Sequence, residues 1–294
     1  MDPKTLGAYH TSALLEALSD LHHIHDEPHL FTFVLNRASD VLKAQGGTFF
    51  SIREDQGELY PEASKGVSLA LLREIPFKIK NGLAGWSATN RKAVIVENAQ
   101  GDERFNRAVD VITGVRTRSI LCVPVLRKDT VLGVVELVNR VDGVFRDADL
   151  EFLQYLSRQV GVAIENCRLY RETQDLLGYT SSVINSLSGG FISTDLKGVV
   201  TRCNHSACRI LGIVAEDVLG KPLLQALPDY PAFAAILEIT QKHQTAATRQ
   251  EIELQRPNGA KMLVGYTTFL VRGEAQHHGA GILFQDITHL RRPS

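Results

Sequence analysis

The longest regular pattern in the sequence is a seam of mostly apolar side chains between residues 147 and 187. Its members follow one another at alternating steps of three and four residues; they are Leu153, Leu156, Val160, Ala163, Cys167, Tyr170, Gln174, Leu177, Ser181 and Ile184. No Pro interrupts the stretch, which predicts a helix of about 60 Å. Because the seam outruns one core, we expect the helix to pair with a second copy as a coiled coil. The alternative is an amphipathic helix that covers a single core.

The patterns on either side of this helix each predict a separate domain. Before it come two helical stretches, several short strands, a polar loop over 101–114 and two β-branched strands. From Asn185 the pattern resets to two strands, a short helix, a longer helix and a hairpin at Pro257-Asn258-Gly259, followed by a last strand. We therefore expect an α+β protein of two domains, each an antiparallel sheet with flanking helices. The expected ranges are 1–170, 147–187 for the connecting coiled-coil helix, and 183–294.

Composition narrows the class of protein. A chain of 294 residues can hold two cores, and a hydrophobic share of 44% with 22% charged residues is ordinary for a globular protein. The net charge of −1 argues against a nucleic-acid surface. No run of eighteen apolar residues predicts a membrane span, and the N-terminus lacks the apolar region of a signal peptide. Four scattered cysteines without a CxxC pair indicate a reducing compartment, so we expect a cytoplasmic protein.

The first half of the chain resembles a GAF domain. The resemblance is carried by four motifs in the right order: Gly82–Gly85, Gly101–Phe105, Thr117–Val125 and Gly133–Arg140. It implies a small-molecule pocket between the sheet and the loop 98–119. The residues that it places there as candidate ligand contacts are Asp102, Phe105, Asn106, Asp110, Thr117 and Ser119. The competing interpretation is that Phe105 only closes this loop over the core.

One subset of GAF domains binds cyclic nucleotides and carries an Asn-Lys, Phe, Asp-Glu signature. This chain has a degenerate form of it, with Asn139, Arg140, Phe145 and Asp149, and with Leu150 where the subset has Glu. Arg140 keeps the positive charge, so an ion pair from strand to helix with Asp149 is expected. A cyclic nucleotide is therefore one candidate ligand. The alternative is that Asn139 is a turn residue and Asp149 a charge favoured at a helix start.

The second half resembles a PAS domain. The carrying residues are Gly190–Asp195, Asn204 with Ile210–Gly212, Gly220–Leu223 and Phe284–Thr288. The sequence argues against the usual cofactors, because it lacks the reactive-cysteine run of flavin photosensors and its candidate haem ligand, His243, has polar neighbours. Cys203 and Cys208 need not share a face and, with His205, fall one ligand short of a zinc site, so we read them as small hydrophobes. No metal site is predicted.

These resemblances point to signalling rather than catalysis. The sequence contains no phosphate-binding loop, nucleophile elbow, HExxH or GxGxxG motif, so no catalytic residue is predicted. The GAF-then-PAS order resembles bacterial sensor histidine kinases, nucleotide cyclases and related regulators. We expect a homodimeric sensory module that binds a small ligand and signals through the helix 147–187. The signal would reach an output domain or a partner signalling protein, as in a two-component system. The alternative is the N-terminal sensory part of a histidine kinase or nucleotide cyclase whose catalytic domain lies beyond Ser294.

Overall fold

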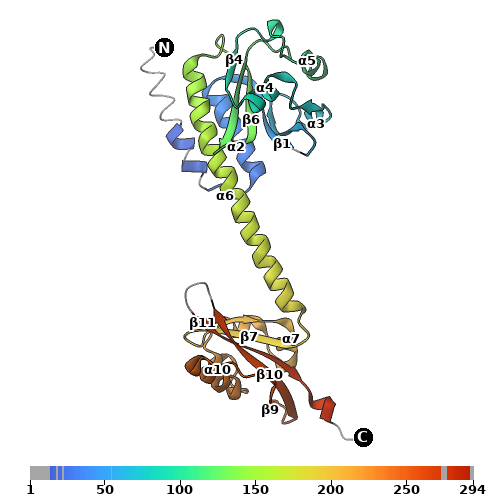
Figure 1. Ribbon diagram of the computed structural model, residues 1–294, viewed down its shortest axis with the longest axis vertical. Helices are drawn as coiled ribbons and strands as arrows, with labels where there is room; N and C mark the ends of the chain where they lie inside the picture. Colours follow the sequence, from blue (N-terminus) through green and yellow to red (C-terminus); the bar gives the residue numbers. More distant parts are fainter. Residues whose placement is uncertain (1–13, 18, 22, 54, 273–276, 292–294) are drawn as a thin grey trace. The chain divides into compact units, whose positions relative to one another are not determined.

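A computed structural model describes residues 14–291 of the chain, except 18, 22, 54 and 273–276. The chain divides between Gln174 and Asp175 into two compact units (Figure 1). Each unit contains one antiparallel sheet with helices, and the long helix α6 (Asp147–Ser186) runs from the first unit into the second. The α+β class, the two sheets and the long helix are as predicted. No helix in the described part of the chain combines the length and apolarity that crossing a membrane requires.

The sheet of the first unit has six strands in the order β3-β2-β1-β6-β5-β4. The strands are β1 (Ala44–Arg53), β2 (Glu58–Lys65), β3 (Phe77–Lys78), β4 (Val94–Val96), β5 (Ile120–Arg127) and β6 (Thr130–Arg140). The helices are α2 (Glu27–Val41), α3 (Leu69–Arg73), α4 (Gly82–Asn90), α5 (Arg107–Thr113) and the first part of α6, with a 3-10 turn at Ala99–Gly101. Asp26 caps α2 by accepting the N–H of His29, and Pro28 lies in the first turn, where its missing N–H costs nothing.

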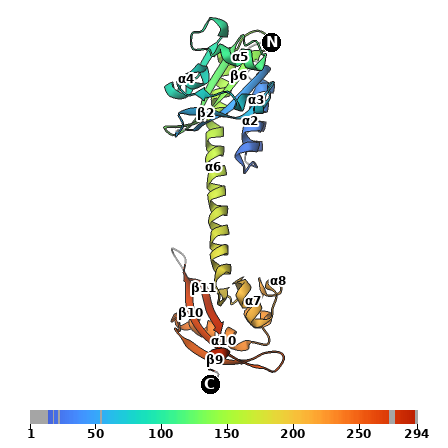
Figure 2. The ribbon, with the colours of Figure 1, turned by 90° about the vertical axis from the view of Figure 1, so that its right-hand side faces the viewer.

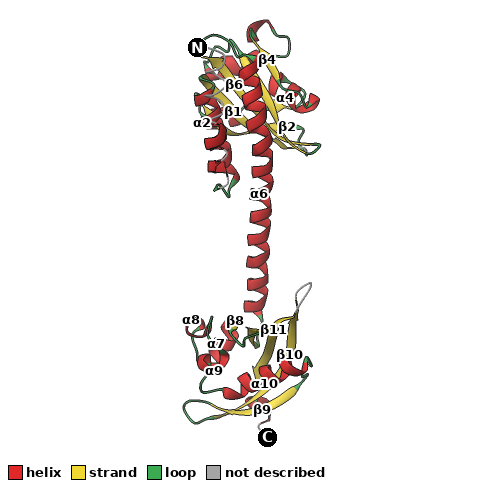
Figure 3. Ribbon diagram, turned by 90° about the vertical axis from the view of Figure 1, so that its left-hand side faces the viewer, coloured by secondary structure: helices red, strands yellow, loops and turns green. Residues whose placement is uncertain are grey.

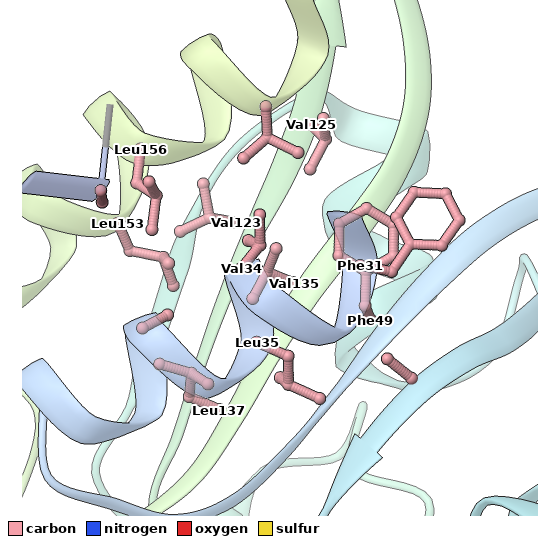
Figure 4. Packing of buried hydrophobic residues seen from close by; sticks show 14 of the residues in the cluster. Phe31, Val34, Leu35, Phe49, Val123, Val125, Val135, Leu137, Leu153 and Leu156 are labelled. Atoms are coloured by element: carbon pink, nitrogen blue, oxygen red, sulfur yellow. The ribbon is translucent and has the colours of Figure 1, made fainter. Parts of the chain in front are cut away.

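Both faces of this sheet are covered, because its central strands carry apolar side chains on both faces. On one face, α2 and α6 pack against β1, β5 and β6, as Figures 3 and 4 show. Phe31, Leu35, Phe49, Leu137 and Leu153 belong to this core. The opposite face carries a second core, in which Phe50 of β1 packs with α4. Neighbouring residues of one strand thus belong to different cores, as the two-residue period of a strand requires.

The predicted helical seam is divided between two environments. Leu153, Leu156, Val160, Ala163 and Cys167 are at most 8% exposed and belong to the first unit's own core. The prediction that they face a second copy is therefore wrong, because the sheet and α2 already cover them. From Arg168 to Tyr179 every residue of α6 is exposed. Pairing of two copies along this later part stays a prediction.

The second unit has a five-stranded sheet in the order β8-β7-β11-β10-β9. Its strands are β7 (Gly190–Asp195), β8 (Val200–Cys203), β9 (Gln250–Gln255), β10 (Lys261–Arg272) and β11 (His277–Asp286). Its helices are α7 (His205–Leu211), α8 (Ala215–Val218), α9 (Leu223–Ala226) and α10 (Pro231–His243), followed by a 3-10 turn at Thr288–Arg291. These helices cover one face of the sheet (Figure 2), where Phe233 of α10 packs on Phe284 of β11 with ring centroids 4.8 Å apart.

Candidate functional site

The first unit encloses a cavity of about 300 Å³ on the sheet face opposite α6. Thr48 and Phe50 of β1, Ile120 of β5 and Glu136 and Val138 of β6 form its floor. Its walls come from α3, the start of α4 and the segment 105–117. A volume of this size lies at the lower end of the range for small-molecule sites.

Glu136 is the polar centre of an otherwise largely apolar floor. The strand register places it between Thr48 of β1 and Cys122 of β5, and Cys122 Sγ lies 3.3 Å from Glu136 Oε2. Burial raises the pKa of the Glu136 carboxyl above its ordinary value, and burial together with this carboxyl raises that of the Cys122 thiol. Glu136 keeps partial exposure and lines the cavity. A carboxyl in this position is available to a ligand inside the cavity.

A hydrogen-bond network holds the segment that closes the cavity. Asp110, on α5, accepts the hydroxyl of Thr117 on one carboxylate oxygen at 2.6 Å and its N–H on the other at 2.9 Å. Gln100 Nε2 donates to the same Asp110 carboxylate at 2.8 Å and to the Thr117 carbonyl at 3.0 Å. Asn106 caps α5 by accepting the N–H of Ala108. The wall is therefore fixed by side chains that lie just outside or at the edge of the cavity.

The degenerate signature residues hold this wall to the sheet and to α6. Asn139, with φ of 55°, accepts the N–H of Arg118 at 2.7 Å and donates to the carbonyl of Arg116 at 2.9 Å. Arg140 Nε lies 3.1 Å from Asp149 Oδ2, and these side chains are 11% and 1% exposed. The ion pair expected between Arg140 and Asp149 is thus present. Asn139 also lines the cavity, whereas Phe145 is 1% exposed in the core that contains α6.

The six candidate contacts divide evenly. Phe105, Asn106 and Thr117 line the cavity. Asp102, Asp110 and Ser119 are not among its lining residues. Asp102 pairs with Arg104 instead, with Oδ2 2.7 Å from a guanidinium nitrogen, and this hydrogen bond lowers the pKa of the Asp102 carboxyl.

Sequence reasoning missed the floor of the site. Glu136 interrupts the β-branched run of β6, and a lone carboxyl in such a run is the signal that could have identified it. Thr48 offers no such signal, because its role follows only from its register beside Glu136. Lys78 and the start of α4 also line the cavity. Among the described residues the N-cap of α4, Asn81, makes no side-chain capping bond, so the first N–H groups of α4 keep donor capacity.

The chain is similar in sequence to known 3',5'-cyclic phosphodiesterases over 47% of its length. The chain is 33% identical over 146 residues to a probable 3',5'-cyclic phosphodiesterase pde-5 of Caenorhabditis elegans, an alignment that covers 47% of this chain and 20% of that protein. It is 32% identical over 147 residues to the cGMP-specific 3',5'-cyclic phosphodiesterase of Drosophila melanogaster, covering 47% of this chain and 12% of that one. The chain therefore spans a fifth or less of the length of these relatives.

A solved GAF domain has the same fold. It comes from a phosphoenolpyruvate-protein phosphotransferase of Coxiella burnetii and aligns with a TM-score of 0.52 at 15% identity, over 55% of this chain and 96% of that one. Family models match the chain as a GAF domain over residues 24–165 and as a PAS fold over residues 178–287. The chain thus carries a GAF domain followed by a PAS domain, the arrangement that its motifs predict.

Proposed function

We propose that this chain is a cytoplasmic sensory module that binds a small ligand in its GAF cavity and passes the signal through α6. GAF and PAS domains are sensory domains of signalling proteins. The observation that carries the proposal is the cavity of about 300 Å³ with the carboxyl of Glu136, whose pKa is raised, on its floor. All four cysteines are free thiols, which supports a reducing compartment. The output belongs to another domain or a partner signalling protein.

A cyclic nucleotide is the ligand class that these residues support best. Glu136 would accept an N–H or O–H of the ligand, and Phe105 offers an aromatic ring that also lines the cavity. Lys78 and the N-terminus of α4 would meet the phosphate, since a helix N-terminus presents free N–H groups and the positive end of its dipole. The names of the relatives, which include cGMP-specific enzymes, make cGMP the first ligand to test.

The departure from the signature at Leu150 does not weaken this proposal. Leu150 is partly buried and packs against the core shared by α2 and α6, on the sheet face opposite the cavity. The signature acts through Asn139, which holds the cavity wall, and through the ion pair of Arg140 with Asp149. Both interactions are present in this chain, so the change from Glu to Leu removes no side chain from the cavity.

Isothermal titration calorimetry of the full chain with cGMP, cAMP and 5'-GMP tests ligand binding. We expect cGMP to bind and Glu136→Ala to weaken binding by tenfold or more, about 1.4 kcal/mol or above, because a buried ligand donor would lose its acceptor. The matched control is Glu74→Gln, an exposed carboxyl outside the cavity. If none of the three nucleotides binds at millimolar concentration, the cyclic-nucleotide assignment is wrong.

Signal transmission requires a second copy, and the exposed part of α6 supports this. Leu169, Leu176 and Val183 recur every seven residues and are 55%, 63% and 43% exposed. Thr173 and Thr180 lie between them, and their hydroxyls donate to α6 carbonyls at 2.8 and 2.9 Å, so neither needs a partner elsewhere. A seven-residue apolar repeat on a free helix face favours a parallel pair of identical helices.

Cross-linking tests this pairing. We expect a Cys introduced at Leu177 or Ile184 to join two protomers in the absence of reductant. Both positions belong to the seam predicted from the sequence and lie next to the face formed by Leu169, Leu176 and Val183. Cys at Asp175, which is exposed and lies outside both seams, serves as the control. Light scattering provides the independent measurement, and a monomer at micromolar concentration would exclude the dimeric mechanism while leaving ligand binding open.

A further inference from the structure

Two half-buried thiols lie in contact at the edge of the PAS sheet. Cys203 is the last residue of β8 and Cys208 lies on α7, and their sulfur atoms are 3.7 Å apart. The sequence alone did not require the two cysteines to share a face, and the structure brings them together because Cys203 ends β8 and α7 begins directly after Asn204. Both side chains keep partial exposure, so a small solute can reach them.

Asn204, between these cysteines, holds the C-terminal end of α6. Its side chain is 1% exposed, and its Nδ2 donates to the carbonyls of Ile184 at 3.0 Å and Gly189 at 2.9 Å. Its Oδ1 accepts the N–H groups of Phe191 and Ala207, both at 2.8 Å. A change of backbone between the two cysteines therefore reaches the end of α6 through one side chain.

We infer that Cys203 and Cys208 form a reversible disulfide when a hydroperoxide oxidises them. This bond changes the hydrogen bonds that Asn204 makes to the end of α6. A disulfide has an S–S distance of about 2.05 Å, so the sulfurs must approach by about 1.6 Å. Asn204 lies within the small loop that the new bond closes, so its backbone must adjust. The inference is independent of any ligand in the GAF cavity.

The two thiols have different roles in this reaction. Burial and the neighbouring Cys208 raise the pKa of the Cys203 thiol to about 12. The thiolate of one of the two cysteines attacks the peroxide. Attack on the peroxide forms an S–O bond, breaks the O–O bond and releases an alcohol, or water from hydrogen peroxide. The sulfur of the other cysteine then attacks the resulting sulfenic acid, forming the S–S bond, and the departing hydroxide leaves as water with the proton of the second thiol. Two thiols lose two electrons and the peroxide gains them.

Mass spectrometry of the full chain tests the bond. The reduced protein is treated with hydrogen peroxide, alkylated and digested with trypsin, which cleaves after Arg202 and Arg209 and so releases both cysteines in one peptide. We expect this peptide to lose two hydrogens and to regain them with dithiothreitol. The peptides with Cys122 and Cys167, which are at most 1% exposed, should remain thiols. If Cys203 and Cys208 stay alkylatable, or oxidise separately to sulfinic acids, the inference is wrong.

Hydrogen exchange tests the effect on the hydrogen bonds of Asn204, the side chain that holds the end of α6. We expect oxidation to change the exchange rate of the Phe191 amide, which donates to Asn204, by threefold or more, and to leave the rate of the Asn139 amide in the first unit unchanged. The variants Cys208→Ala and Cys203→Ser cannot form the bond and should show no peroxide response at Phe191. A disulfide that forms without a change at Phe191 would overturn the proposed coupling.

Discussion

The buried ion pair at the start of α6 makes a quantitative prediction about the GAF fold. Asp149 Oδ2 contacts Arg140 Nε at 3.1 Å and accepts the N–H of Arg146 at 2.9 Å, while its side chain is 1% exposed. Asp149→Ala leaves the Arg140 guanidinium without its carboxylate in a site that is only 11% exposed, and it frees the N–H of Arg146, the residue directly before α6. Removing one partner of a buried pair costs about 3–5 kcal/mol. We expect the first unit to lose stability of this order.

Urea unfolding followed by tryptophan fluorescence measures this loss. Trp86 is the only Trp of the sequence and lies on α4, so its emission reports the first unit. With a loss of about 4 kcal/mol and a slope of about 2 kcal/mol/M, the midpoint should fall by about 2 M. Asp147→Ala is the matched control, because this exposed carboxyl in the same helical turn loses only a several-fold smaller interaction with the helix dipole.

A double variant without either charge separates the ion pair from the rest of the site. Arg140→Met combined with Asp149→Leu removes both charges and keeps similar volume, so the double variant should recover much of the stability that Asp149→Ala loses. Equal midpoints for Asp149→Ala and Asp147→Ala would refute the reasoning, because burial would then add nothing to the value of the pair.

Three further predictions concern other parts of the chain. Gly161→Ala places a methyl group 2.2 Å from a backbone carbonyl and should destabilise the first unit by about 1–3 kcal/mol. Gly178→Ala has open space around the new methyl group and should stabilise the helix by about 1 kcal/mol. Thermal unfolding distinguishes the two variants. Burial raises the pKa of the Glu136 carboxyl above its ordinary value of 4.5, so the folded state binds this proton more tightly than the unfolded state does. The free energy of unfolding should therefore fall as the pH rises from 4.5 through the raised pKa, and the urea midpoint of Glu136→Gln should rise relative to that of the wild type over the same interval. Asn204→Ala should speed amide exchange at Phe191 by tenfold or more, while Asn258→Ala, at an exposed turn, should not.

The sequence predicts which helices and strands form better than it predicts what each of them packs against. The order of helices and strands, the two antiparallel sheets and the unbroken α6 follow from periodicity and turn residues. The seam of α6 does not reveal what covers it, because a helix on its own sheet and a helix in a coiled coil both repeat apolar residues at three- and four-residue steps. Leu153 and Leu177 share this spacing, yet the first is buried in the core and the second is 48% exposed.

The cavity illustrates the same limit at the level of single residues. Phe105, Asn106 and Thr117 could be placed at the cavity because they belong to a loop with a recognisable motif. The place of Glu136 in the cavity depends on strand register, because only the pairing of β6 with β1 and β5 turns this side chain away from α6 and toward the cavity. Both faces of the sheet are covered, so the usual alternation of apolar and polar residues does not specify the register.

Among the described residues, a buried polar side chain contacts α6 near each of its ends, in each case within the same unit. At the start, Asp149 binds Arg140, whose neighbour in the chain, Asn139, both lines the cavity and holds its wall. At the other end, Asn204 binds the carbonyl of Ile184. Buried polar groups of this kind have few alternative partners, so a shift at either end changes hydrogen bonds in discrete steps rather than gradually. These contacts, together with the exposed apolar repeat along the later half of α6, support the proposal that this helix acts as a two-state connector.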